Sequence, residues 1–366
     1  MALIGSEGFD MYNGAGTSTG LQAKWLYQYP SFGSSSASTN FSFTTGRFGG
    51  QALVMTPTGF PGRVLYAAPG GAVTQLTWGM AILNAANNGL YAGGGVLVFM
   101  SAGAPVFSIA INGAMGFTVN AVNGWGASTG GLNVTSVLGV SPQTGLSQIG
   151  NWQYLEVAGQ AGLAGTGSIT LYLQGQTVLS LTGLTLSASF DTVCVMPGVF
   201  NIGNGQSDGT YSLDDMYLSN TSTPLGPIRV STIRPSGAGA STQWSPLTGA
   251  NWTQVSETLV DGDTSYVFSN TVGQSDLYGM TPLPITPPSI LGVNVVTFAE
   301  ATDSNPRAIY AQIRSGLGST VYTGSAINLS GGYYRYDRML TQDPFSAAAW
   351  TVTGVNGSQI GPNLAS

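Results

Sequence analysis

The stretch NWQYLEVAGQAGLAGTGSITLYLQGQTVLSLTG (Asn151–Gly183) decides the fold class. Its second half, Ile169–Leu181, alternates large apolar and small polar residues on either side of Gly175, which is the pattern of a β-hairpin. The first half, with Trp152 and Tyr154, reads as a further strand leading into that hairpin. A period of two favours a sheet with one face on a core, as in the middle of a β-sandwich.

The same pattern recurs along the first part of the chain. Short runs rich in Val, Ile, Thr and aromatic residues alternate with Gly, Asn, Pro and Ser clusters, at the spacing of an all-β protein. Helical periodicity is nearly absent. The runs predict strands at residues 52–57, 63–68, 75–83, 95–102, 105–112, 116–122 and 191–197.

The composition changes near residue 221. The segment TSTPLGP (Thr221–Pro227) has the residues of an interdomain linker, and six of the nine basic residues follow it. We expect a domain at 1–222, a linker at 223–228 and a second domain at 229–366. A second set of strands is predicted at residues 265–270, 289–301, 308–315, 319–329 and 332–340, with the Pro-rich residues 280–289 as an edge or connecting loop.

The charge content is unusually low. Only 7% of the residues are charged, against about 25% in an average protein. The apolar fraction of 43% is ordinary, so the chain should fold rather than stay disordered. No charged residue occurs from Val64 to Leu155. Such a surface repels its neighbours weakly, which favours packing against other subunits and a homo-oligomer; a neutral surface without a partner is the alternative.

Several partners and compartments are disfavoured by the same composition. The formal charge is −6 and the basic residues are scattered, so nucleic-acid binding is not expected. No run of 18 apolar residues and no basic-then-apolar leader occurs, which predicts neither membrane insertion nor a signal peptide. Cys194 is the only cysteine, so no intramolecular disulfide forms, and its apolar neighbours predict a buried thiol.

The chain contains no histidine, which excludes His-dependent nucleophiles and His-ligated metals. A Ser-Lys mechanism would need Lys24, the one lysine, for which the sequence identifies no partner. A glycosidase needs two facing carboxylates, and no predicted strand carries acids on alternate residues. Catalytic residues are therefore not expected.

Two adjacent acids, Asp214 and Asp215, lie in the segment SDGTYSLDDMYLSN. Consecutive strand residues point to opposite faces, so a catalytic pair is not expected. Calcium is the alternative, with Asp208 and Asn204 supplying further oxygens to Asp214 or Asp215. A structural role in strand and turn hydrogen bonding is favoured over this metal site, and no other cofactor is expected.

Trp125, in the segment NGWGAS, is the best candidate for ligand contact. Its Gly-rich surroundings predict a loop, whereas Trp78 and Trp152 lie on predicted strands, where tryptophan is usually part of the core. We therefore expect Trp125 to contact a ligand, such as a host surface glycan.

The order of several short motifs resembles a known family. GSEGFDMYNG (5–14), LQAKW (21–25), the hairpin and SLDDMYLSN (212–220) resemble the concanavalin A-like (laminin G-like) jelly roll of tailed-phage and prophage structural proteins. The later part of the chain, beginning with residues 225–246, is similar to the second domain of those proteins. The resemblance implies that the opening strand, with Phe9 and Asp10, lies beside the closing strand at Asp214–Tyr217.

The resemblance implies a non-enzymatic structural component of a tailed-phage virion. The expected protein is associated with the tail, baseplate or fibre, is located in the virion and packs against other virion structural proteins. Two alternatives remain open: a capsid decoration or head-fibre protein, and a receptor-recognition module for host attachment that binds host glycans. A glycan-degrading enzyme is disfavoured because a paired-acid motif is missing.

Overall fold

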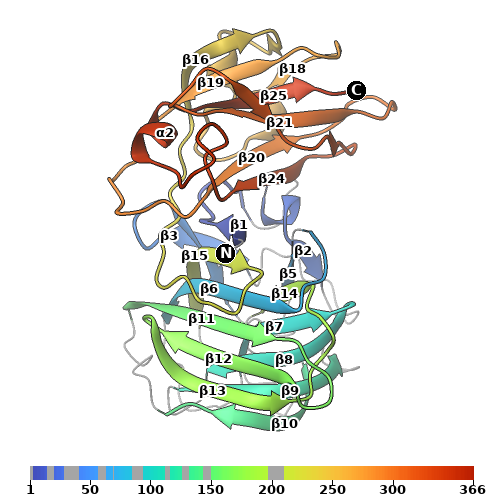
Figure 1. Cartoon of the computed structure of the whole chain (residues 1–366). Helices are drawn as coiled ribbons and strands as arrows, with labels where there is room; N and C mark the ends of the chain where they lie inside the picture. The colour runs from blue at the N-terminus through green and yellow to red at the C-terminus, as the bar shows by residue number, and fades with distance from the viewer. Residues whose placement is uncertain are drawn as a thin grey trace. The chain divides into compact units, whose positions relative to one another are not determined.

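The protein is built almost wholly from β-strands (Figure 1), as the alternating pattern predicted. The computed structural model describes residues 3–14, 20–28, 41–56, 63–68, 70–84, 94–111, 116–125, 132–142, 150–196 and 210–366. Within these residues, no helix is long and apolar enough to cross a membrane.

The chain divides into two compact units. Unit 1 comprises Met1–Phe9, Gly14–Gly16 and Trp25–Val230, and unit 2 comprises Asp10–Asn13, Thr17–Lys24 and Ser231–Ser366. Unit 2 thus takes in short pieces from the beginning of the chain, which a reading along the sequence cannot assign to it.

Unit 1 is a jelly-roll sandwich of two antiparallel sheets (Figure 1). The eight-stranded sheet has the order β13-β12-β11-β6-β15-β4-β3, with β1 also pairing with β15. Its strands are β1 (Leu3–Glu7), β3 (Phe41–Thr45), β4 (Gln51–Met55), β6 (Gln75–Asn84), β11 (Trp152–Gln160), β12 (Gly167–Leu173), β13 (Gln176–Leu184) and β15 (Tyr211–Ser219).

The seven-stranded sheet of unit 1 has the order β10-β9-β8-β7-β14-β5-β2. Its strands are β2 (Leu26–Gln28), β5 (Arg63–Ala67), β7 (Gly94–Ser101), β8 (Ala104–Ile111), β9 (Phe117–Trp125), β10 (Leu132–Val140) and β14 (Thr192–Val195).

The predicted hairpin is present as β12 and β13. Gln174 and Gly175 both have positive φ, +51° and +76°, as the two central residues of a tight hairpin turn require. The opening strand β1 pairs antiparallel with the closing strand β15, with Glu7 opposite Met216. The pairing of opening and closing strands is as the motif order implied, but β1 ends at Glu7, so Phe9 and Asp10 lie beyond the strand that was expected to carry them.

The sandwich interior is filled by aromatic side chains from both sheets. Trp25, Tyr66 and Trp78 meet edge to face, with ring centroids 5.0 to 6.1 Å apart. Phe99 stacks on Phe107 at 4.5 Å. Such contacts add to the area that each ring removes from water, and they fix which face of each strand points inward.

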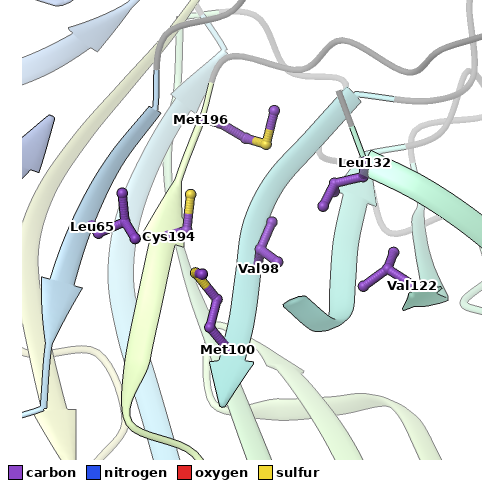
Figure 2. Packing of buried hydrophobic residues seen from close by; sticks show 7 residues of the cluster. All are labelled: Leu65, Val98, Met100, Val122, Leu132, Cys194 and Met196. Atoms are coloured by element: carbon purple, nitrogen blue, oxygen red, sulfur yellow. The ribbon is translucent and has the colours of Figure 1, made fainter. Parts of the chain in front are cut away.

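The seven-stranded sheet is buried on both faces at its centre. Phe99 points into the sandwich, so its neighbours Val98 and Met100 point outward, yet both are buried. They belong to an outer apolar cluster (Figure 2) formed by Leu65, Val98, Met100, Val122, Leu132, Cys194 and Met196. The thiol of Cys194 is buried here, as its apolar neighbours predicted.

Unit 2 has a six-stranded sheet of order β16-β19-β25-β21-β22, with β23 also pairing with β21, and two small two-stranded sheets. The six strands are β16 (Pro235–Thr242), β19 (Asp276–Met280), β21 (Ala308–Arg314), β22 (Val321–Thr323), β23 (Ile327–Asn328) and β25 (Gln359–Leu364). The small sheets pair β17 (Ser245–Pro246) with β18 (Val267–Phe268), and β20 (Val293–Ala299) with β24 (Tyr334–Leu340).

Among the described residues, the helices are single turns: η1 (Leu21–Ala23), η2 (Asn251–Gln254), η3 (Gly262–Thr264) and α2 (Val352–Asn356). The core of unit 2 lies around Val295, Ile313 and Trp350.

Two acids organise unit 2: Asp276, which is buried, and Asp337, which is partly buried. Asp276 accepts hydrogen bonds from the Gln243 and Trp244 amides and from the side chains of Asn251 and Tyr278. Asp337 forms ion pairs with Lys24 at 2.7 Å and with Arg335 at 2.9 Å. Lys24, for which the sequence identified no partner, thus forms an ion pair with a carboxylate of unit 2.

Candidate functional site

The outer face of the eight-stranded sheet carries a polar network. Trp78 lies in the sandwich interior, so Gly79 on β6 faces outward, together with the residues paired with it, Glu156 on β11 and Tyr217 on β15. Tyr154 shares this face because it lies two residues before Glu156. All of these side chains are buried.

The network holds the segment Thr221–Val230, which we call the strap. The Gly226 amide donates to Glu156 Oε1 at 2.8 Å, and the Leu225 amide donates to the Tyr217 hydroxyl at 3.0 Å. Tyr217 in turn donates to Glu156 Oε1. Side chains of the sheet thus bind the backbone of the strap, which has no strand partner of its own in the described residues.

Asp214 and Asp215 hold the C-terminal end of the strap and the turn between β3 and β4. Asp215 accepts the Val230 amide at 2.7 Å and an Arg47 Nη1 hydrogen bond at 3.3 Å. Asp214 accepts the Arg47 amide, also at 2.7 Å. The pair therefore fixes both the strap and the turn between β3 and β4, which is the structural role that the sequence favoured.

The expectation that the two acids face opposite sides fails for a specific reason. The pairing of β15 with β6 shifts between Asp214 and Tyr217, and Asp215 has a φ of +49°. A β-bulge breaks the strict alternation of side chains, so both carboxylates reach the same residue, Arg47. An aspartate tolerates this left-handed conformation better than most residues.

Burial sets the protonation of this network. It raises the pKa of Tyr154 well above its usual range, with the charges of Tyr217, Glu156 and Asp215 adding to the effect. Burial also raises the pKa of Asp215, against the opposing effects of the Val230 amide and Arg47. Tyr154 therefore stays a neutral donor, and it donates to the Asp215 carbonyl oxygen at 2.9 Å. The network is buried and ties the strap to the sheet, so we call it the clamp; Glu156 Oε2 is the one oxygen of this carboxylate without a hydrogen-bond partner in the described residues.

The calcium hypothesis receives no support from the described part of the chain. Within it, no group of three or more acidic or cysteine side chains is arranged to hold a metal ion. Asp208 and Asn204 lie outside the described residues, so the combination with Asp214 and Asp215 stays a prediction. Asp214 and Asp215 already accept hydrogen bonds from Arg47 and Val230.

Trp125 lies at the end of a strand and not in a loop. It is the last residue of β9, pairs with Leu132 on β10, and packs partly buried against the outer apolar cluster. Near the same ends of β9 and β10, the exposed Asn133 amide donates to Asn123 Oδ1 at 2.5 Å. Asn133 lies between Leu132 and Val134, which belong with Trp125 to the outer apolar cluster, so the amide pair projects from the opposite face of the sheet.

The described strands around Trp125 carry no charge. Strands β7 to β10 contain no Asp, Glu, Lys or Arg. The register places Cys194, Val98, Ser108 and Asn120 in one row across the outward side of the sheet. The row changes from apolar to polar toward β9, so hydrogen-bonding groups gather on the side of the sheet where Trp125 lies.

The sequence reading missed the clamp. Its signal was present in NWQYLEVAG, where Glu156 interrupts an apolar strand two residues after Tyr154. An acid in the middle of a central strand requires a buried partner, and this expectation would have led to a search for donors. The backbone donors come from the strap, and no strand periodicity places that segment.

No family model and no curated protein matches the chain. Solved structures with similar folds include an endo-β-1,4-glucuronan lyase from the fungus Trichoderma reesei, with 17% identity over 52% of this chain and 90% of that one, and a TM-score of 0.38. An alginate lyase from Aplysia kurodai matches at 9% identity over 62% and 100%, with a TM-score of 0.43. A heptameric pentraxin from Limulus polyphemus matches at 14% over 47% and 76%, with a TM-score of 0.31.

The jelly-roll fold rests on the order and pairing of the two sheets of unit 1, whereas the expected function is corrected. The expectation of a non-enzymatic structural component of a phage virion is contradicted, because the similar solved structures named above are polysaccharide lyases and a pentraxin. The exclusion of enzymes is withdrawn with it: one scaffold hosts many activities, so a jelly roll does not imply a passive role. The resemblance to phage proteins stays a prediction.

Proposed function

We propose that unit 1 binds a neutral glycan where Trp125 lies on the seven-stranded sheet. The observation that supports this most directly is the partly buried indole at the end of β9, on strands without charge. A sugar needs an apolar ring for its C–H face and fixed amides or hydroxyls for its hydroxyl groups. The indole supplies the ring, and amides are supplied by Asn120 on the same face of β9 and by the exposed Asn123–Asn133 pair at that end of the sheet.

The absence of charge defines the class of sugar. An anionic sugar would need cations nearby, because moving its carboxylate out of water without a partner is costly. Strands β7 to β10 supply none. Amide side chains offer both donors and acceptors, which suits the hydroxyl groups of neutral hexoses.

The test is binding of the full-length protein to immobilised neutral oligosaccharides. Trp125→Ala should weaken binding at least ~10-fold, equivalent to about 1.4 kcal/mol, whereas Trp125→Phe should retain most of it because an aromatic ring remains. Val137→Ala, at an exposed site on the same strand as Asn133, is the matched control and should bind normally.

Two results would refute the proposal: no neutral glycan bound at millimolar concentration, or equal affinity of Trp125→Ala and the unmutated protein. Mass spectrometry of the incubated glycans shows whether the chain also shortens them. Melting temperatures of all three variants should agree within a few degrees, so that a loss of binding cannot be attributed to unfolding.

A further inference from the structure

A second aromatic side chain is exposed between two arginines. Phe48, in the turn between β3 and β4, is 50% exposed. The guanidinium carbons of Arg47 and Arg229 each lie 4.7 Å from the centre of its ring. Two of the chain's few charged residues and one of its exposed aromatic residues thus lie together in unit 1.

Arg47 is held in position by the clamp described above. Its amide donates to Asp214, and its Nη1 donates to Asp215 and to the Ile228 carbonyl oxygen at 3.2 Å. The Asp215 side chain is 3% exposed, whereas that of Arg47 is 17% exposed. The carboxylate therefore lies beneath and the cation lies nearer to solvent, so an approaching ligand meets positive charge first.

Arg229 has unused hydrogen-bonding capacity. Its Nε is buried and has no hydrogen-bond partner in the part of the chain that the structure describes. A buried donor without an acceptor is unfavourable, and a bound anion would remove that cost. A guanidinium also binds a carboxylate through two parallel hydrogen bonds, which makes it selective for planar anions.

We infer that Arg47, Phe48 and Arg229 form a binding site for an acidic sugar, that is, a sugar ring bearing a carboxylate. The carboxylate would meet the guanidinium groups that lie over the Phe48 ring, and the sugar ring would contact the exposed rim of the phenyl group. An aspartate or glutamate side chain of a peptide has no ring to cover that rim, which favours a sugar over an acidic peptide.

This site is separate from the one at Trp125, and the two proposals are independent. Arg47 and Phe48 belong to the turn between two strands of the eight-stranded sheet, whereas Trp125 lies on the seven-stranded sheet. The Trp125 site has no charged residues on its strands, while this site has two cations. Either site can fail its test without affecting the other.

The test uses the full-length protein and an oligosaccharide of glucuronic acid, titrated by calorimetry at low salt. Its carboxyl-reduced, neutral counterpart is titrated in parallel. The acidic oligosaccharide should bind at least ~10-fold more tightly than the neutral one, and its affinity should fall as salt is added. Arg229→Gln should lower that affinity ~10-fold or more, and Phe48→Leu should lower it several-fold because the aromatic ring is lost.

Arg307→Gln is the matched control, since Arg307 is an arginine of unit 2 paired with Asp303 at 2.7 Å, and it should leave binding unchanged. Three outcomes would overturn the inference: equal affinity for the acidic and neutral oligosaccharides, no effect of Arg229→Gln in a variant that melts normally, or tighter binding of an oligoglutamate peptide that competes for the site.

Discussion

Gly79→Ala should destabilise unit 1 strongly, although it adds only one methyl group. Gly79 faces the ring of Tyr217, and a Cβ at this position would overlap three of the ring's carbons. The ring is fully buried and its hydroxyl is engaged by Glu156 and by the Leu225 amide, so it cannot move without losing these hydrogen bonds.

The magnitude follows from two contributions. Overpacking of a well-packed site costs about 1–3 kcal/mol. Displacing the hydroxyl leaves buried polar groups without partners, at a further cost of about 1–3 kcal/mol. Together they amount to about 4 kcal/mol, which lowers the melting temperature of a unit of this size by about 10 °C. Thermal unfolding measures the total, and faster hydrogen exchange of the Leu225 and Gly226 amides should report the local release of the strap.

Two further variants test this reasoning. Gly237→Ala, at a glycine in β16 with no atom within 4 Å of the added Cβ, should change stability by less than about 0.5 kcal/mol. In a Tyr217→Ala background, Gly79→Ala should cost little, because the overlapping ring is gone. A cost below about 1 kcal/mol in the unmutated protein, or an equal cost in both backgrounds, would refute the argument.

Three further predictions concern buried groups elsewhere in the chain. Asp276→Ala should lower the free energy of unfolding by about 4 kcal/mol in urea titrations, since it leaves its buried donors unsatisfied. Burial raises the pKa of Asp337, but Arg335 and Lys24 lower it further and hold it below the ordinary value. The stability that these ion pairs contribute is therefore present above about pH 4 and is lost as the pH falls through the folded-state pKa. Asp337→Asn should lower the free energy of unfolding at neutral pH and reduce the loss of stability in acid. The thiol of Cys194 should react with a thiol reagent only when urea unfolds unit 1, and rapid labelling in buffer would contradict its burial.

Most strands of unit 1 were predictable because their side chains alternate. β12 and β14 lie within the predicted runs, and β6, β8 and β11 each extend one residue beyond theirs. β10 was missed, although LNVTSVLGV contains four β-branched residues, because it is an edge strand with several exposed positions. Its apolar residues are not confined to one face: Val137 and Val140 are exposed. Burial alternation, the basis of the prediction, is weak in such a strand.

The candidate sites were less predictable for a different reason. Trp125 was singled out as a ligand contact, which stays a prediction, and its Gly-rich neighbours predicted a loop where β9 continues. The aspartate pair was assigned to hydrogen bonding without its partners, because Arg47 lies 167 residues away in sequence. Phe48 and Arg229 are 181 positions apart and become neighbours only through the clamp. Contacts between residues so far apart in sequence leave no local pattern that would predict them.

Because the seven-stranded sheet is buried on both faces at its centre, its apolar strands can associate with other chains before folding is complete. Strands β5 to β10 fall almost wholly in the stretch without a charged residue. Charges beside apolar strands normally act as gatekeepers that slow intermolecular β-pairing, and none is available here. Refolding yield should therefore fall steeply with protein concentration, and chaperones that hold unfolded chains apart should matter more for this protein than its final stability suggests.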